Sequence, residues 1–160
     1  MMNQKREAEV WSRVMAASAE APCCAPKKEK ITITCQQVME LLEGELMDAC
    51  TYRTLAMRVK KSIREPLLCL YRDEMRHYRK LEAVYYLMTG KRPCPDRPKA
   101  PCVACTNEEL RKRYEGEVEG AAVYHGLAEC AGSFAPVFHC LGCEEERHAQ
   151  TILNLLQKCL

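Results

Sequence analysis

Two segments of the chain carry the same set of chemically active side chains. In RDEMRHYR, Glu74 precedes His77 by three residues, and in CEEERHAQ, Glu145 precedes His148 by the same spacing. Residues three apart on an α-helix share a face, so each segment can direct a carboxylate and an imidazole toward one point. Because carboxylates and imidazoles are common ligands of first-row transition metals, the repeated spacing indicates a metal site.

A second repeat adds two more carboxylates. Glu45 and Glu117 each precede a tyrosine, Tyr52 or Tyr124, by seven residues, and the two copies lie 72 positions apart. Apolar matches are cheap in any helical protein, whereas a core does not call for matched glutamate and tyrosine at fixed spacing. Seven residues make nearly two helical turns, so each glutamate shares a face with its tyrosine. A face that carries tyrosine is expected to point inward, together with its glutamate.

The elements that must position these residues are four helices. They are expected over about 35–61, 63–89, 107–131 and 134–158. The first three helices are predicted to begin at capping boxes, namely Thr34–Gln37, Ser62–Glu65 and Thr106–Glu109. The fourth is predicted to begin at a serine cap, Ser133. Gly90 is a natural end for the second helix, and the proline-rich residues 91–105 cannot form regular helix. The fold class predicted is therefore all-α, a four-helix bundle with one long crossover between two antiparallel helix hairpins.

The N-terminal part is expected to precede the bundle and to cover an apolar groove, on this subunit or on a partner subunit. Residues 4–19 have the spacing of a short amphipathic helix with Trp11 on its apolar side, followed by a linker. The predicted organisation is thus an N-terminal helix and linker over 1–33 and a bundle over 34–160.

Hairpin geometry brings the repeated residues to one height. In an antiparallel helix pair, two residues at the same distance from the turn lie side by side. Glu45 and the Glu74 motif are about equally far from the first turn, and Glu117 and the Glu145 motif are about equally far from the second. Facing hairpins would gather four carboxylates and two imidazoles in mid-bundle, which is a ligand set for two metal ions. The expected ligands are Glu45, Glu74, His77, Glu117, Glu145 and His148. Buried glutamates without partners would each cost several kcal/mol, so a core would keep them only with bound cations. Glutamates that face solvent have no such cost and would not indicate a metal site.

The neighbours of these residues can support the ligands. Asp73 and Glu144 are expected to hold the far ring nitrogen of the histidine on the opposite half, and Arg76 and Arg147 to pair with those acids. The two tyrosines are expected to donate hydrogen bonds to ligand carboxylates.

With these residues in view, positions 35–158 resemble the ferritin-like superfamily and, within it, the rubrerythrin group. The resemblance depends on E-x6-Y-x-x-L-A and (D/E)-E-x-R-H, each present twice. It implies a site for two iron ions, with manganese or mixed metals as alternatives. It also implies reduction of hydrogen peroxide or activation of dioxygen in oxidative-stress defence. An external electron donor such as a rubredoxin-like protein is expected, because no rubredoxin-like domain follows the fourth helix.

One position departs from the resemblance. Rubrerythrins carry a further glutamate ligand one turn after the third-helix ligand, where this chain has Gly120. Glu119 could serve only if the helix contained a bulge. Two alternatives therefore stay open: a ferroxidase or iron-handling protein, and a non-enzymatic bundle that senses metal or redox state.

Length, charge and cysteine content limit the expected partners and cellular location. The chain has 160 residues, a net charge of +2 and 12 cysteines. The near-balanced charge argues against nucleic acid, and no apolar run suits a membrane span or a signal peptide. The expectation is a cytoplasmic homodimer with reduced cysteines.

The cysteines and two further histidines are less informative. The chain has two Cys-x-x-Cys pairs, Cys102 with Cys105 and Cys140 with Cys143. In an antiparallel bundle the pairs lie ~35 Å apart, so a single metal cannot take both within one subunit. His125 and His139 are out of phase with the expected ligands, and they are treated as ordinary residues.

Overall fold

The computed structural model describes residues 33–159, and every regular element within that range is helical. Four long α-helices and one 3₁₀ turn follow one another, namely α2 (Cys35–Ala56), α3 (Lys61–Thr89), α4 (Thr106–Ala128), η1 (Gly132–Phe134) and α5 (Ala135–Cys159). The all-helical prediction is confirmed for this part of the chain. The helix predicted over 4–19 with Trp11 lies outside the described residues.

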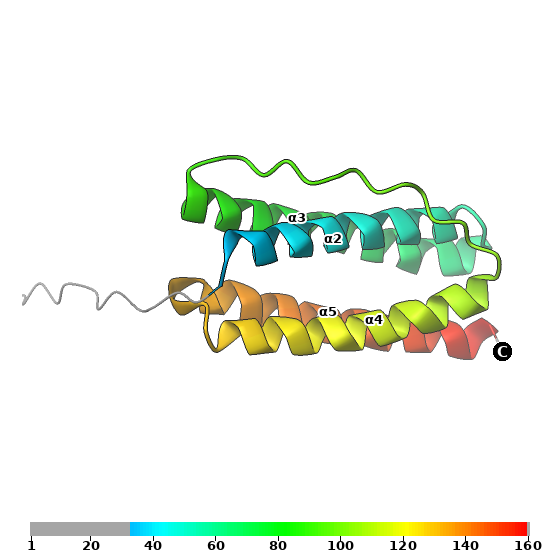
Figure 1. Cartoon of the computed structure of the whole chain (residues 1–160). Helices are drawn as coiled ribbons and strands as arrows, with labels where there is room; N and C mark the ends of the chain where they lie inside the picture. The colour runs from blue at the N-terminus through cyan, green and yellow to red at the C-terminus, as the bar shows by residue number, and fades with distance from the viewer. Residues whose placement is uncertain (1–32, 160) are drawn as a thin grey trace, which may run out of the picture.

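The helices form a bundle of two antiparallel pairs. α2 packs on α3 and α4 packs on α5, and the segment over 90–105 runs the length of the bundle before α4 begins (Figure 1). Val103 in this segment is buried in the same apolar cluster as Leu110 of α4, which anchors the end of the crossover. The predicted long connection between two hairpins is therefore present.

The start of α2 and the end of α3 follow the expected local signals. The Thr34 hydroxyl accepts a hydrogen bond from the Gln37 amide at 3.1 Å, and the Gln37 side-chain oxygen accepts one from the Thr34 amide at 2.9 Å. This is the predicted capping box. α3 ends before Gly90, whose φ of 70° is left-handed and suits a glycine.

The other three helices begin within two residues of their predicted starts, but not at the predicted capping residues. α3 begins at Lys61 and α4 at Thr106 itself, so Ser62 and Thr106 lie inside the first turn instead of at the cap. Neither helix has a side-chain cap hydrogen bond. Ser133 lies within the 3₁₀ turn, and α5 begins after that turn at Ala135. A capping box is a local preference, and the packing of short connections can move a helix start by one or two residues.

The first helix is also shorter than predicted, since α2 ends at Ala56 instead of near 61. Arg64, from the start of α3, contacts the end of this helix. Its side chain donates hydrogen bonds to the carbonyl oxygens of Ala56 at 3.0 Å and Val59 at 3.3 Å. These bonds satisfy carbonyls that the end of a helix leaves free, and they stabilise a tight connection over residues 57–60.

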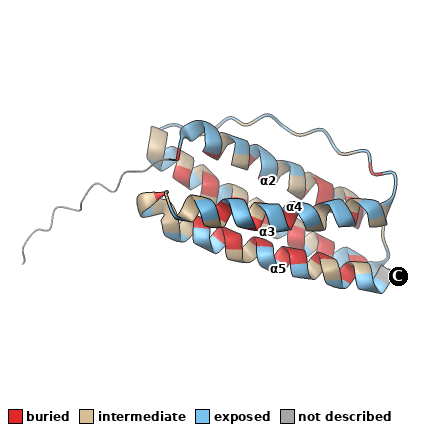
Figure 2. Cartoon of the chain, turned by 60° about the horizontal axis from the view of Figure 1, so that its bottom comes forward, coloured by how far each residue is buried: buried red, intermediate tan, exposed pale blue. Residues whose placement is uncertain are grey.

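Buried residues recur along the inner side of each helix (Figure 2). Their apolar members form two clusters. One cluster includes Leu67 and Leu155, and the other includes Leu42 and Phe138. On every helix, the residues of one cluster are separated from those of the other by buried glutamate or histidine. A polar layer therefore crosses the middle of the bundle. None of the described helices is long and apolar enough to cross a membrane.

Candidate metal centre

All six predicted ligands are buried in the polar layer. Their exposed fractions are Glu45 6%, Glu74 1%, His77 0%, Glu117 6%, Glu145 4% and His148 4%. The only other buried polar residue in the described part of the chain is Thr51, so no buried lysine or arginine offsets the four carboxyl groups. Such a layer requires either bound protons or bound cations, because isolated carboxylates are too costly to bury.

The His77 imidazole faces three of these carboxyl groups. Its Nδ1 atom lies 2.9 Å from Glu145 Oε1, 3.1 Å from Glu74 Oε2 and 3.3 Å from Glu45 Oε2. These residues come from α2, α3 and α5. The first half of the repeat therefore meets the second half within hydrogen-bonding distance.

The His148 imidazole mirrors this arrangement. Its Nδ1 atom lies 3.0 Å from Glu74 Oε1, 3.0 Å from Glu145 Oε2 and 3.4 Å from Glu117 Oε2. Glu74 and Glu145 thus lie between the two histidines, whereas Glu117 approaches only His148. The two imidazole rings are stacked, with centroids 5.1 Å apart. Two adjacent positions, each with its own histidine and sharing two carboxyl groups, fit a dimetal site.

The far ring nitrogens face acids from the opposite half, as predicted. His77 Nε2 lies 2.9 Å from Glu144 Oε2, and His148 Nε2 lies 3.5 Å from Asp73 Oδ2. An acid on the far side of an imidazole sets the orientation of the ring and raises the basicity of the other nitrogen. In both histidines the nitrogen left to face the buried carboxyl groups is therefore Nδ1.

The predicted arginine pairs with these acids are also present. Arg76 Nη2 lies 2.6 Å from Asp73 Oδ1, and Arg147 Nη2 lies 3.5 Å from Glu144 Oε1. Lys80 was not predicted, yet its Nζ atom lies 2.6 Å from Glu144 Oε2. Burial would raise the pKa of Glu144, but the Lys80 ammonium outweighs it and lowers the pKa. Lys80 could have been found from its spacing, one turn after His77.

Each buried tyrosine donates a hydrogen bond to a ligand glutamate of the other hairpin. The Tyr52 hydroxyl donates to Glu117 Oε1, and the Tyr124 hydroxyl donates to Glu45 Oε1. The predicted tyrosine–carboxylate bonds are confirmed, and they cross between α2 and α4. Burial raises the pKa of both hydroxyls, so each stays protonated and remains a donor.

Several buried atoms of the layer have no hydrogen-bond partner. In the described residues these are Glu74 Oε1, both ring nitrogens of His77, and Arg113 Nε outside the layer. The His77 nitrogens are close to carboxylate oxygens but are not aligned with them. A buried polar atom without a partner costs about 1–3 kcal/mol, which a metal ion bound at the same place would offset. The donors of the layer therefore fit a metal better than a network of hydrogen bonds.

The carboxyl groups differ in their preferred protonation. Burial raises the pKa of Glu45 well above its usual value and that of Glu117 to about 9. Burial also acts on Glu74 and Glu145, but the neighbouring His148 and His77 rings outweigh it and lower both pKa values. Without metal, burial therefore favours the protonated form of Glu45 and Glu117, whereas Glu74 and Glu145 favour the ionised form.

The imidazoles complete the charge balance. Burial would lower the pKa of His77, but the surrounding carboxylates raise it to about 12. The pKa of His148 is raised for the same reason. Without metal, these shifts favour two imidazolium ions facing two carboxylates, with two further protons on Glu45 and Glu117. The four protons are what bound cations would displace.

A small cavity leads from the surface to the layer between α2 and α4. Its volume is about 170 Å³, and Glu45, Glu117 and Glu145 form part of its wall. Three glycines also line it, namely Gly44, Gly116 and Gly120. Because glycine has no side chain, the helices leave the carboxyl groups accessible at this point. A second cavity, of about 140 Å³, reaches His148 between α3 and α5.

The structure shows whether Glu119 can replace the glutamate that the rubrerythrin resemblance expects at position 120. The helix is uninterrupted over Thr106–Ala128, and Glu119 is exposed, so the bulge that Glu119 would need is absent. A Cβ atom on Gly120 would lie 3.7 Å from Glu145 Cγ, which is an ordinary contact. The position therefore faces the layer and has room for a Cβ atom.

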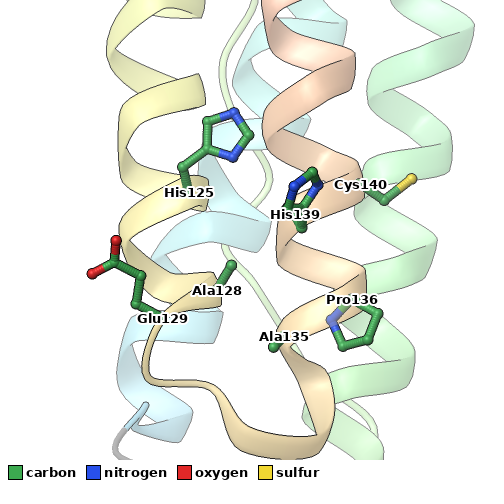
Figure 3. A pocket seen from close by; sticks show the side chains of 7 residues that line it. All are labelled: His125, Ala128, Glu129, Ala135, Pro136, His139 and Cys140. Atoms are coloured by element: carbon green, nitrogen blue, oxygen red, sulfur yellow. The ribbon is translucent and has the colours of Figure 1, made fainter.

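The two Cys-x-x-Cys pairs lie at opposite ends of the bundle. Cys105 directly precedes α4, whereas Cys140 lies in the second turn of α5, and the two helices are antiparallel (Figure 1). The four cysteines of these pairs are free thiols. By contrast, His125 and His139, which were expected to be ordinary, lie over one groove between α4 and α5 (Figure 3).

No protein-family model, curated protein or solved structure matches the chain. The chemistry of the polar layer is therefore argued from its own geometry.

Proposed function

We propose that the chain is a non-haem di-iron oxidoreductase of the rubrerythrin type, with a ferritin-like fold, that reduces hydrogen peroxide or activates dioxygen. The observation that carries the proposal is the layer of four carboxyl groups and two imidazoles buried without a balancing lysine or arginine. Two iron ions held there would supply one electron each to an O–O bond. Manganese or a mixed pair would suit the same donors.

Charge supports two divalent ions. Four ionised carboxylates carry four negative charges, and two divalent ions carry four positive charges, so the layer is neutral when both histidines are neutral. The residues that would hold the ions are the six that converge, with Glu74 and Glu145 shared between the two positions. One ion alone would balance only two of the four carboxylates, so the layer would have to keep two protons as well.

The tyrosines and outer acids hold the ligands in place. Tyr52 and Tyr124 each bind one oxygen of a glutamate, which leaves the other oxygen facing a histidine. Asp73 and Glu144 restrain the two rings from behind. Ligands whose orientation is set in advance lose less freedom on binding metal.

The cavity argues for a small oxidant. Its volume of about 170 Å³ is below the ~300–1,000 Å³ of pockets that take drug-sized molecules. Hydrogen peroxide and dioxygen fit such an opening, whereas bulky organic substrates do not. Reduction of hydrogen peroxide to two water molecules consumes two electrons and two protons. The electrons must be restored by an external donor, for which a rubredoxin-like protein is our proposal.

The test is stopped-flow mixing of the reduced, iron-loaded protein with hydrogen peroxide and, separately, with dioxygen. The proposal expects rapid oxidation by at least one of them, with about two irons per chain retained, the number this ligand set holds. A reconstituted protein that binds no iron would refute it. Oxidation by dioxygen followed by retention of many more irons per chain would instead indicate iron storage.

A further inference from the structure

A second set of metal-binding side chains lies on the outer side of α4 and α5, away from the polar layer. His139, Cys143 and Glu146 are spaced by four and three residues, so they share one face of α5. His125 reaches the same place from α4. Figure 3 shows both imidazoles over the groove between the two helices.

Three of these side chains, His125, Cys143 and Glu146, are close enough to share one ion, and His139 contacts Cys143. His125 Nε2 lies 3.2 Å from Glu146 Oε1, and His139 Nδ1 lies 3.5 Å from Cys143 Sγ. Each of His125, Cys143 and Glu146 offers one ligand atom, and these three atoms lie within 4.8 Å of one another. Ordinary zinc bond lengths at tetrahedral angles separate nitrogen from oxygen by about 3.3 Å and nitrogen from sulfur by about 3.6 Å.

A glycine in the interior of α5 makes this arrangement possible. A Cβ atom on Gly142 would lie 2.7–2.9 Å from three atoms of the His125 ring, which is closer than real contacts. The ring therefore packs directly on the backbone of α5, one residue before Cys143. Glycine in a helix interior costs roughly 0.5–1 kcal/mol relative to alanine. The approach of His125 is a physical reason for a glycine here.

We propose that His125, Cys143 and Glu146, with His139 as the fourth ligand, form a second cation site of the zinc type. Two imidazoles, one thiolate and one carboxylate are donors that Zn²⁺ accepts in tetrahedral sites. The site is chemically distinct from the polar layer, which contains no sulfur. Because its ligands come from α4 and α5, a bound ion ties the two helices together.

The test uses Co²⁺ as a spectroscopic substitute for Zn²⁺ in the full-length reduced protein. Sulfur bound to Co²⁺ gives a charge-transfer absorption that carboxylate and imidazole ligands do not give. We expect this absorption in the wild type and its loss in Cys143→Ser. Cys140→Ser is the matched control, because Cys140 lies one turn earlier on the same helix with its Sγ 3.5 Å from Lys80 Nζ. That variant should keep the absorption.

Gly142→Ala provides a test that removes no ligand. The added methyl group displaces the His125 ring, so Co²⁺ affinity at this site should fall at least about tenfold, as when a group that orients a ligand is lost. Circular dichroism should show the helix content unchanged. An absent absorption in the wild type, its persistence in Cys143→Ser, or equal affinity in Gly142→Ala would each overturn the proposal. Iron content is measured in parallel, so failure here is separable from failure of the di-iron proposal.

Discussion

Loading the metal-free protein with two divalent ions should release about four protons per chain near neutral pH. Two come from Glu45 and Glu117, whose pKa values burial raises, that of Glu117 to about 9. Two more come from His77 and His148, whose pKa values the surrounding carboxylates raise despite burial. Each of these groups must lose its proton before it binds a metal.

The release can be counted by isothermal titration calorimetry in buffers of different ionisation enthalpy. Glu117→Gln, which carries no titratable proton, should release about three, one fewer than the wild type. Glu119→Gln is the matched control, since Glu119 is exposed two residues away on the same helix. Release near zero in the wild type, or equal release in the two variants, would refute the charge pattern derived for the layer.

The same protons determine two pH dependences. Metal affinity should rise steeply with pH, because fewer protons then compete for the ligands. Metal-free stability should change in the opposite sense. The pKa of Glu117 is raised from 4.5 to about 9 on folding, so the folded state binds more protons between these values. The contribution of this group to the free energy of unfolding therefore falls as pH rises through that range. Denaturant unfolding of the metal-free protein at a series of pH values measures it.

Three further variants test the roles assigned to single residues. Glu117→Ala should lower iron affinity at least about 100-fold, more than loss of a supporting group, whereas Glu119→Ala should leave bound iron unchanged by elemental analysis. Tyr52→Phe should lower the free energy of unfolding of the metal-free protein by about 1–3 kcal/mol, because a buried carboxyl oxygen loses its donor; an unchanged denaturation midpoint would contradict this. Gly116→Leu should slow the oxidation of the protein by peroxide, measured by stopped flow, without loss of iron. Gly126→Leu is the control, since Gly126 is exposed on the same helix, and it should leave the rate unchanged. Equal rates in the two variants would show that peroxide does not enter through the glycine-lined cavity.

The sequence alone was enough to predict the helical bundle and the six residues of the polar layer. Both predictions depend on spacing within helices and on symmetry between the two halves. Glu74 and His77 share a helix face whatever surrounds them. The same spacing recurs at Glu145 and His148, which argues against a chance occurrence. Local signals were less dependable, because Thr34 caps its helix as predicted whereas Ser62 does not cap α3.

The tertiary structure decided which side chain meets which. The sequence predicts that Tyr52 binds a glutamate, but only the packing of α2 against α4 makes that glutamate Glu117. The outer site was missed for the same reason. His125 is 18 residues from Cys143 and lies on another helix, and its approach requires the bare backbone of Gly142. Spacing within one helix is a property of the chain, whereas contacts between helices depend on how closely two backbones approach, and side-chain volumes at the interface determine that distance.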